Sequence, residues 1–119
     1  MSFKILYDFE SRLYESKKIK YKYPDRIPII CEKIYNARNT PNLDKKKYLV
    51  PDDYTIGQFL FIIRRRNELH NKSTQSIYLF IDGGIPSTSN YLRTIYNQHK
   101  DSDGFLYIEY SSENTFGYK

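Results

Sequence analysis

The first 24 residues carry apolar side chains at the spacing of an α-helix. Leu6, Phe9 and Leu13 recur at intervals of three and four residues, so they would lie on one helical face. The stripe is narrow, and charged side chains surround it. Pro24 predicts the end of the helix, because proline disfavours helical geometry in the residue before it. We therefore expect residues 1–24 to form a helical extension that packs on a domain built by the rest of the chain.

Four short segments rich in apolar and β-branched residues predict strands. They span residues 26–33, 46–50, 77–81 and 105–110. Both faces of the first strand are apolar, so either both are buried or one contacts a molecule outside this chain. Pro28 in that strand favours a locally unpaired or edge position. Lysines in the second strand favour the edge of a sheet, whereas the unbroken apolar run of the third is typical of a central strand.

A helix is predicted between the second and third strands. Thr55 and Gln58 have the spacing of a capping box, in which each side chain accepts a hydrogen bond from the other residue's amide. The helix would run to about Asn67. The positions that share its expected core-facing sector are Ile56, Leu60 and Ile63. The positions expected at the margin of that sector are Phe59 and Ile62.

The chain between the third and fourth strands predicts a turn and a further helix. Residues 82–84 read Asp-Gly-Gly, a turn sequence, and residues 87–89 offer hydroxyl side chains as N-caps. The positions that then follow at helical spacing are Leu92, Ile95, Tyr96 and His99.

The predicted order of elements is helix, strand, strand, helix, strand, helix, strand. This order predicts an α+β fold with helices on a four-stranded mixed sheet, and it resembles the ubiquitin-like β-grasp with an N-terminal helical extension. We expect three regions: the helical extension at 1–24, a ubiquitin-like domain at 25–110 and a flexible C-terminal tail at 111–119.

Composition and motifs argue against an enzyme. The 119 residues suit one domain, and a single cysteine excludes an internal disulfide framework or a cysteine-rich zinc site. We find no glycine-rich phosphate-binding motif and no H-E-x-x-H motif, so we expect no catalytic residue, metal or cofactor. Cys31 alternates with Ile27 and Ile29 on one strand face, which predicts a buried structural thiol. His70 and His99 have no second metal ligand in view.

Several blocks, collinear over nearly the whole chain, resemble one known family. They are Tyr23-Pro-Asp-Arg26 with the Ile-Pro-Ile-Ile that follows, Leu43-Asp-Lys-Lys-Lys-Tyr-Leu-Val-Pro51, Gly57-Gln-Phe59, Ile63-Arg-Arg-Arg66, Phe105-Leu-Tyr-Ile108 and Phe116-Gly117. The chain is similar in these blocks to the autophagy ubiquitin-like modifiers. That family includes the yeast autophagosome modifier, the GABA-A-receptor-associated protein and microtubule-associated protein light chain 3.

The resemblance implies a modifier that other enzymes process and attach. In the family a cysteine protease trims the precursor after its C-terminal glycine. An activating and a conjugating enzyme then join that glycine to phosphatidylethanolamine on the growing autophagosome membrane. The implied attachment residue is Gly117, and residues 118–119 are the removed extension. Glycine suits this step because an extended tail without a side chain can thread a narrow catalytic cleft. The implied location is the cytoplasm, and the autophagosome membrane once lipid is attached.

The resemblance also implies docking of aromatic-x-x-aliphatic peptides from cargo receptors and adaptors, by strand addition along residues 46–50. The implied lining of the aromatic pocket is Glu15, Ile19, Pro28, Ile30, Lys47, Leu49 and Phe105. The implied lining of the aliphatic pocket is Tyr48, Val50, Pro51, Tyr54, Phe59 and Ile62. The implied contacts to acidic residues beside the peptide motif are Arg26, Lys45, Lys46 and Arg66. The alternative, from the residues alone, is that these apolar side chains are core: Pro28, Ile30, Leu49, Phe59 and Ile62.

The charge of the chain leaves a second function open. A formal charge of +5 and the interleaved Tyr and Lys of residues 14–23 favour an unconjugated basic module that binds RNA, tubulin or an anionic membrane. No RNA-binding aromatic motif is present, so nucleic acid is the least expected of these partners.

Overall fold

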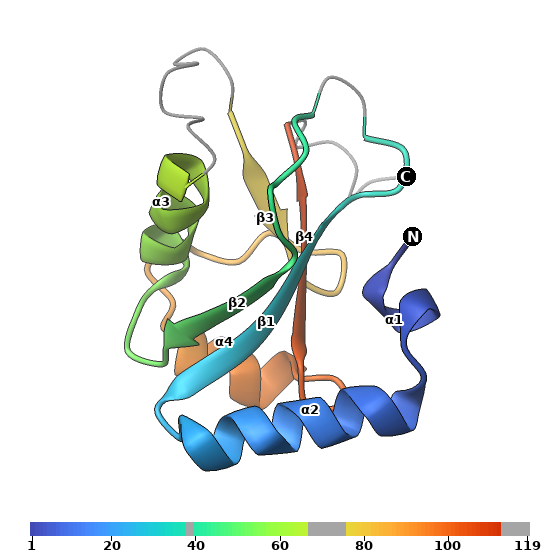
Figure 1. The fold of residues 1–119 in the computed structure, drawn as a ribbon. Coiled ribbons are helices and arrows are strands. Elements are labelled where there is room, and N and C mark those ends of the chain that lie inside the picture. The colour runs from blue at the N-terminus through green and yellow to red at the C-terminus, as the bar shows by residue number, and fades with distance from the viewer. Residues whose placement is uncertain (38–39, 67–75, 113–119) are drawn as a thin grey trace.

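The computed structural model describes residues 1–37, 40–66 and 76–112, and it has the predicted α+β architecture (Figure 1). A four-stranded mixed sheet lies between α3 on one side and α1 on the other, with α2 across one end. The helices are α1 (Phe3–Leu6), α2 (Phe9–Lys22), α3 (Ile56–Arg66) and α4 (Leu92–His99). The strands are β1 (Arg26–Lys33), β2 (Lys47–Pro51), β3 (Tyr78–Phe80) and β4 (Leu106–Ser111).

The strand order is β2-β1-β4-β3, which gives the four-stranded mixed sheet that the sequence predicts. β1 runs parallel to β4 at the centre and antiparallel to β2, which lies at the edge that its lysines predict. The expectation that residues 77–81 form a central strand is wrong, since β3 pairs only with β4. Leu79 and Phe80 are nevertheless buried on opposite faces of this edge strand. A continuous apolar run therefore indicates burial on both faces and not the place of a strand in the sheet.

Both faces of β1 are buried within the chain itself. Ile27 and Ile29 lie on one face in the main core, together with side chains of α3 and α4. Ile30 lies on the other face in a second cluster with Phe3 of α1 and Phe105. The N-terminal helices thus cover the face that the sequence left unassigned.

Pro28 occupies a paired strand at a point where its missing N–H is not needed. The amide of Cys31 donates to the carbonyl of Lys46 on the β2 side, at 2.8 Å. Backbone groups alternate along a strand, so the nitrogen of Pro28 faces the β4 side instead. Pairing with β4 begins only at Ile29, opposite Leu106. Pro28 itself is paired with Leu49 of β2, so it is neither in an edge strand nor unpaired on both sides; the position is unpaired on the β4 side alone.

The N-terminal extension is two helices and not one. Asp8 interrupts it, because its side chain accepts a hydrogen bond from the amide of Ser11 at 2.8 Å and so caps α2. The predicted apolar stripe does not face the domain, since Leu6 is 53% exposed and Phe9 is 40% exposed. α2 ends at Lys22, close to the predicted stop before Pro24.

Polar side chains dock α2 on the sheet. Asp103, just before β4, is fully buried. Its carboxylate accepts hydrogen bonds from Arg12 Nη1 (2.5 Å), the Tyr107 hydroxyl (2.5 Å) and the Phe105 amide (2.9 Å). The hydroxyl of Ser16 donates to the carbonyl of Asp103 at 2.5 Å. Burial and the bond to Asp103 raise the pKa of Tyr107, so its hydroxyl stays protonated as a donor.

The capping box of α3 is confirmed. Thr55 N donates to Gln58 Oε1 at 2.8 Å, and Gln58 N donates to Thr55 Oγ1 at 3.1 Å. The assignment of its faces needs one correction. Phe59 is completely buried in the main core, whereas Leu60 is only partly buried against it. The rings of Phe59 and Tyr48 pack edge to face in this core, with their centroids 5.5 Å apart.

The segment before α4 forms the predicted turn but not the predicted caps. Asp82 and Gly83 adopt positive φ values of 50° and 82°, and the Ile81 and Gly84 backbones hydrogen bond across the turn. The N-cap of α4 is Tyr91, without a side-chain cap. The carbonyls of residues 88 and 90 instead accept hydrogen bonds from the first amides of α3.

The tail begins later than expected. Ser111 is the last residue of β4, and Ser112 N donates to Thr40 Oγ1 at 3.1 Å. Residues 113–119, with Gly117, lie outside the described residues.

Removing the partner of Asp103 tests whether the buried ion pair fixes α2. Arg12→Ala should lower the free energy of unfolding by about 3 kcal/mol, because it leaves a buried carboxylate without its counter-charge. Urea unfolding of both proteins at pH 7 measures the difference. Arg65→Ala, at an exposed position of α3, is the matched control and should change stability by less than about 0.5 kcal/mol. A loss below 1 kcal/mol for Arg12→Ala (about the size of an exposed pair) would contradict this role.

The β1–β4 register places two carboxylates opposite each other, Glu32 and Glu109. Burial, and then the charge of Glu32, raise the pKa of Glu109. Ionisation of Glu109 therefore opposes folding, and stability should fall as the pH rises from about 4.3, the ordinary value, through the raised pKa. Glu109→Gln should raise the free energy of unfolding at pH 7 by roughly 0.2–1 kcal/mol. The gain should shrink at pH 4; an equal gain at both pH values, in urea titrations, would exclude a charge effect.

Candidate functional site

The outer side of β2 is a free strand edge among the described residues. The carbonyl of Lys46 faces β1, where it accepts from Cys31. By alternation Tyr48 and Val50 also face β1, while the N–H and C=O groups of Lys47 and Leu49 face outward. Two residues of this edge therefore offer backbone donors and acceptors to a further strand.

A groove of about 680 Å³ lies between α1 and this edge. Its apolar lining consists of Phe3, Leu6, Tyr7 and Leu49. Its cationic lining consists of Arg26, Lys45, Lys46 and Lys47. No carboxylate lines it, so the groove favours an apolar segment that carries negative charge.

The structure brings together all the residues implied for the aromatic pocket. Ile19, Ile30 and Phe105 share the second core cluster. Across the strands Pro28 pairs with Leu49 and Ile30 pairs with Lys47, and Lys47 forms an ion pair with Glu15 of α2. The seven residues thus lie close together, between α2 and β2.

The floor of this region is already packed. Pro28, Ile30 and Phe105 are fully buried, as the core alternative held, whereas Leu49 is partly exposed. Phe3 of α1 contacts Phe105 edge-on, with ring centroids 5.3 Å apart. A ligand side chain would therefore contact the partly exposed margin, which comprises Glu15, Ile19, Lys47 and Leu49.

The aliphatic set is divided in the same way. Tyr48, Val50 and Phe59 are buried in the main core, which corrects the expectation that Phe59 lines a surface. The members left partly exposed on the α3 side of β2 are Pro51, Tyr54 and Ile62.

Three of the four expected contacts to acidic residues line the groove: Arg26, Lys45 and Lys46. Arg66 does not line it, because it lies at the end of α3 and pairs with Asp44 at 3.3 Å. Lys45 lies over the ring of Tyr48, 4.8 Å from its centroid. The cations beside β2 therefore come from both ends of the β1–β2 pair.

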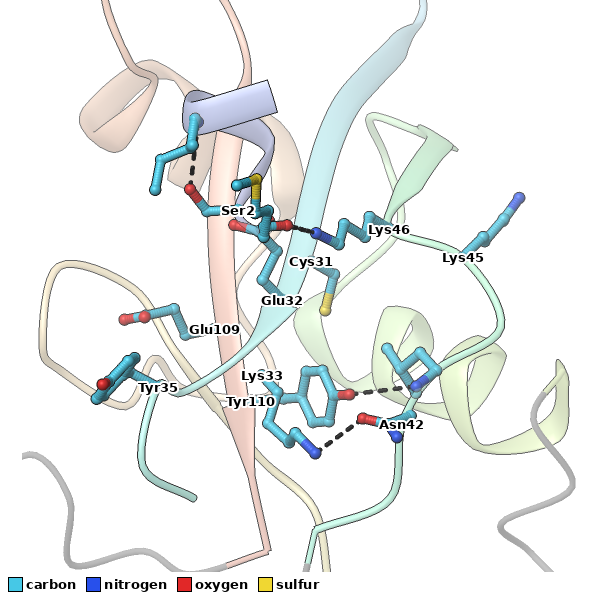
Figure 2. Close-up of a pocket in the computed structure, with 13 residues that line it drawn as sticks. Ser2, Cys31, Glu32, Lys33, Tyr35, Asn42, Lys45, Lys46, Glu109 and Tyr110 are labelled. Carbon is cyan, nitrogen blue, oxygen red and sulfur yellow. Dashed lines mark hydrogen bonds and ion pairs between the residues drawn. The ribbon is translucent and has the colours of Figure 1, made fainter. Parts of the chain in front are cut away.

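A second pocket, of about 560 Å³, lies beyond Lys46, at the start of α1 and the ends of β1 and β4 (Figure 2). Figure 2 shows the side chains of Lys46 and Glu32 pointing toward each other, with 3.2 Å between Nζ and Oε2. The same carboxylate accepts a hydrogen bond from Phe3 N at 2.7 Å, and Lys46 donates to the carbonyl of Met1. These contacts hold α1 against the sheet. Burial raises the pKa of Cys31 in this pocket, which keeps its thiol protonated.

Sequence reasoning missed Phe3 and Glu32. Phe3 precedes Leu6 by three residues and so continues the spacing of the stripe, but it was not counted there, and its partners Ile30 and Phe105 are distant in the chain. The alternation of β1 places Glu32 on the same face as Ile30. That alternation was the one signal that could have placed an anchoring carboxylate on the α1 side.

No group of three His, Cys, Asp or Glu side chains among the described residues could hold a metal ion. None of the described helices has the length and apolar character to cross a membrane.

Comparison with known proteins agrees with the fold and with the sequence blocks. A family model described as "Autophagy protein Atg8 ubiquitin like" matches residues 11–117. Autophagy-related protein 8 of Schizosaccharomyces pombe is 52% identical over 97% of this chain and 93% of its own length. Autophagy-related protein 8 of Mycosarcoma maydis is 50% identical over 98% of this chain and 96% of its own length. The crystal structure of Trypanosoma brucei ATG8 matches with a TM-score of 0.85 and 39% identity, covering 93% of each chain. This chain belongs to the Atg8 family of ubiquitin-like autophagy proteins.

Proposed function

We propose that this chain is a conjugated autophagy modifier that also recruits cargo receptors. Gly117 is the residue that becomes attached to phosphatidylethanolamine, after a cysteine protease removes residues 118–119 and activating and conjugating enzymes act on the new terminus. The β2 edge docks aromatic-x-x-aliphatic peptides. The protein works in the cytoplasm and, once lipidated, on the autophagosome membrane.

The observation that carries the docking proposal is the unpaired β2 edge between two partly exposed apolar margins. A peptide that adds as a strand hydrogen bonds to the outward groups of Lys47 and Leu49. Its side chains alternate between the two faces of the sheet. Anchors separated by three positions therefore point to opposite faces, one toward α2 and Leu49, the other toward α3 and Ile62.

Two features of the edge favour entry of such a peptide. The ion pair of Lys47 with Glu15 is partly exposed, so separating it costs little free energy. Four cations line the groove beside it; Lys46 and Lys47 pair with Glu32 and Glu15, whereas Arg26 and Lys45 take part in none of the ion pairs of the described residues and attract acidic residues next to the aromatic anchor. The groove thus favours motifs with an acidic flank.

The conjugation proposal is supported by the family match, which extends through residue 117. Gly117 follows the block at Phe116 and precedes two residues that a protease would remove. Membership of the family therefore supports the proposal that this chain is a substrate of conjugating enzymes and that those enzymes catalyse the attachment.

Leu49→Ala tests the edge. The variant should weaken binding of an aromatic-x-x-aliphatic peptide with an acidic flank by about 1–3 kcal/mol, as truncation of a central interface side chain does. Isothermal titration calorimetry measures the affinity. Ile85→Ala, which removes an exposed side chain from the loop before α4, is the control and should leave it unchanged. Equal affinities for Leu49→Ala and the unaltered chain would remove Leu49 from the site.

Processing tests the tail. A family-matched cysteine protease should yield a product that lacks Tyr118 and Lys119, as intact-protein mass spectrometry would show. Gly117→Ala should slow this cleavage by at least about tenfold, because an added methyl group obstructs a narrow cleft. Retention of both residues after treatment with a protease that cleaves another family member would argue against attachment at Gly117.

A further inference from the structure

The flank of α2 that faces away from β2 forms part of a separate pocket. This pocket, of about 430 Å³, lies between α2 and α4. α2 contributes Leu13, Ser16, Lys17 and Lys20, and the chain from α4 to β4 contributes Tyr96, Lys100, Asp101, Ser102 and Gly104. Positions 13, 17 and 20 share one helical flank, and Glu15 and Ile19 share the other. The pocket is therefore distinct from the groove at the β2 edge.

The pocket has an apolar floor and a cationic rim. Lys20 and Lys100 each place Nζ 5.3 Å from the ring centroid of Tyr96. The hydroxyl of Tyr96 donates to the carbonyl of Gly104 at 2.7 Å, which holds the ring in place between the two helices. Leu13 completes the apolar part of the lining.

The positive charge of the rim is not neutralised by ion pairs. Across residues 1–37, 40–66 and 76–112, none of the ion pairs involves Lys17, Lys20 or Lys100. Asp101, the one carboxylate in the lining, is paired with Lys4 at 2.7 Å. Three lysines outside these ion pairs thus line a pocket that also contains the ring of Tyr96 and the side chain of Leu13.

We propose that this pocket binds a peptide segment of a partner protein in which an apolar side chain lies between acidic residues. The apolar side chain contacts Leu13 and the ring of Tyr96, and the flanking carboxylates meet Lys17 and Lys100. Such charge pairing raises the association rate and the selectivity, and burial of the apolar side chain contributes to the affinity. A bare phosphate or lipid headgroup would leave the apolar floor without a partner.

The place of the pocket also favours a protein over a membrane. It adjoins Gly104, just before β4, whereas the last described residue, Ser112, lies just past the other end of this strand (Figure 1). Six strand residues separate these ends by roughly 17–20 Å. This step rests on the proposed attachment of lipid at Gly117, because the chain would then leave the domain for the membrane from the end of β4 that is farther from the pocket.

The test is a chemical-shift titration of the ¹⁵N-labelled chain with the capped peptide Glu-Glu-Leu-Glu-Glu. Concentration-dependent shifts are expected at the amides of Ser16, Ser102 and Gly104. Lys17→Gln/Lys100→Gln should weaken binding there about five- to tenfold, given the usual size of exposed charge pairs. Lys20 is left intact because it also donates to the carbonyls of Pro24 and Arg26.

Two controls separate the pocket from general charge. Lys18→Gln/Lys22→Gln removes the same charge from exposed positions of α2 outside the pocket, and it should weaken binding less than twofold. The peptide Glu-Glu-Gly-Glu-Glu, which lacks the apolar side chain, should bind at least about threefold more weakly. Equal losses for both double variants, equal binding of both peptides, or shifts confined to the β2 groove would overturn the proposal.

A vesicle arm excludes the membrane alternative. Phosphatidylcholine vesicles with and without phosphatidylinositol 4-phosphate are floated with the chain and with Lys17→Gln/Lys100→Gln. Little binding, equal for both proteins, is expected. Lipid-dependent binding that the double variant abolishes would overturn the choice of a peptide. The probe carries no aromatic anchor and is followed at the α2–α4 pocket, so its failure leaves the β2-edge proposal to its own calorimetric test.

Discussion

The buried carboxylate of Asp103 fixes the position of α2, and both of the proposed binding surfaces include residues of that helix. An amphipathic helix usually docks through an apolar stripe, but the buried side chains of α2 are Arg12 and Ser16. Their hydrogen bonds to Asp103 are directional, so they fix the rotation of the helix as well as its position. That rotation turns Glu15 and Ile19 toward the β1–β2 side and turns Lys17 and Lys20 toward α4.

The elements that the sequence predicted correctly are those with local causes. Alternation in β1, the capping box at Thr55 and the turn at Asp82 each depend on neighbours a few residues away, and all three are present. The errors arose where distant contacts decide. β3 is an edge strand because β4 pairs with β1, and α2 buries Arg12 because Asp103 lies beneath it. Neither fact has a local signal.

The candidate site was predictable in membership but not in depth. The family resemblance named residues that do gather on either side of β2. The resemblance could not distinguish the fully buried side chains of this set from the accessible ones, because burial depends on what covers each side chain. Phe3 from α1 covers Ile30 and Phe105, and the packing of α3 encloses Phe59. The accessible part of each pocket is therefore a margin of side chains such as Leu49 and Ile62 above a rigid base.

The imino acid at position 28 links the sheet to this arrangement. Any other residue would present an amide hydrogen toward β4, and a buried donor requires an acceptor. A longer parallel ladder would supply one, with Phe105 and the residues before it drawn into the strand. Since proline makes no such demand, the chain is free to leave the sheet ahead of Leu106 and to curl under the helix with Asp103. Because Pro28 has no amide hydrogen to donate, β4 can begin at Leu106, and the residues before it are free to form the surface on which α2 packs.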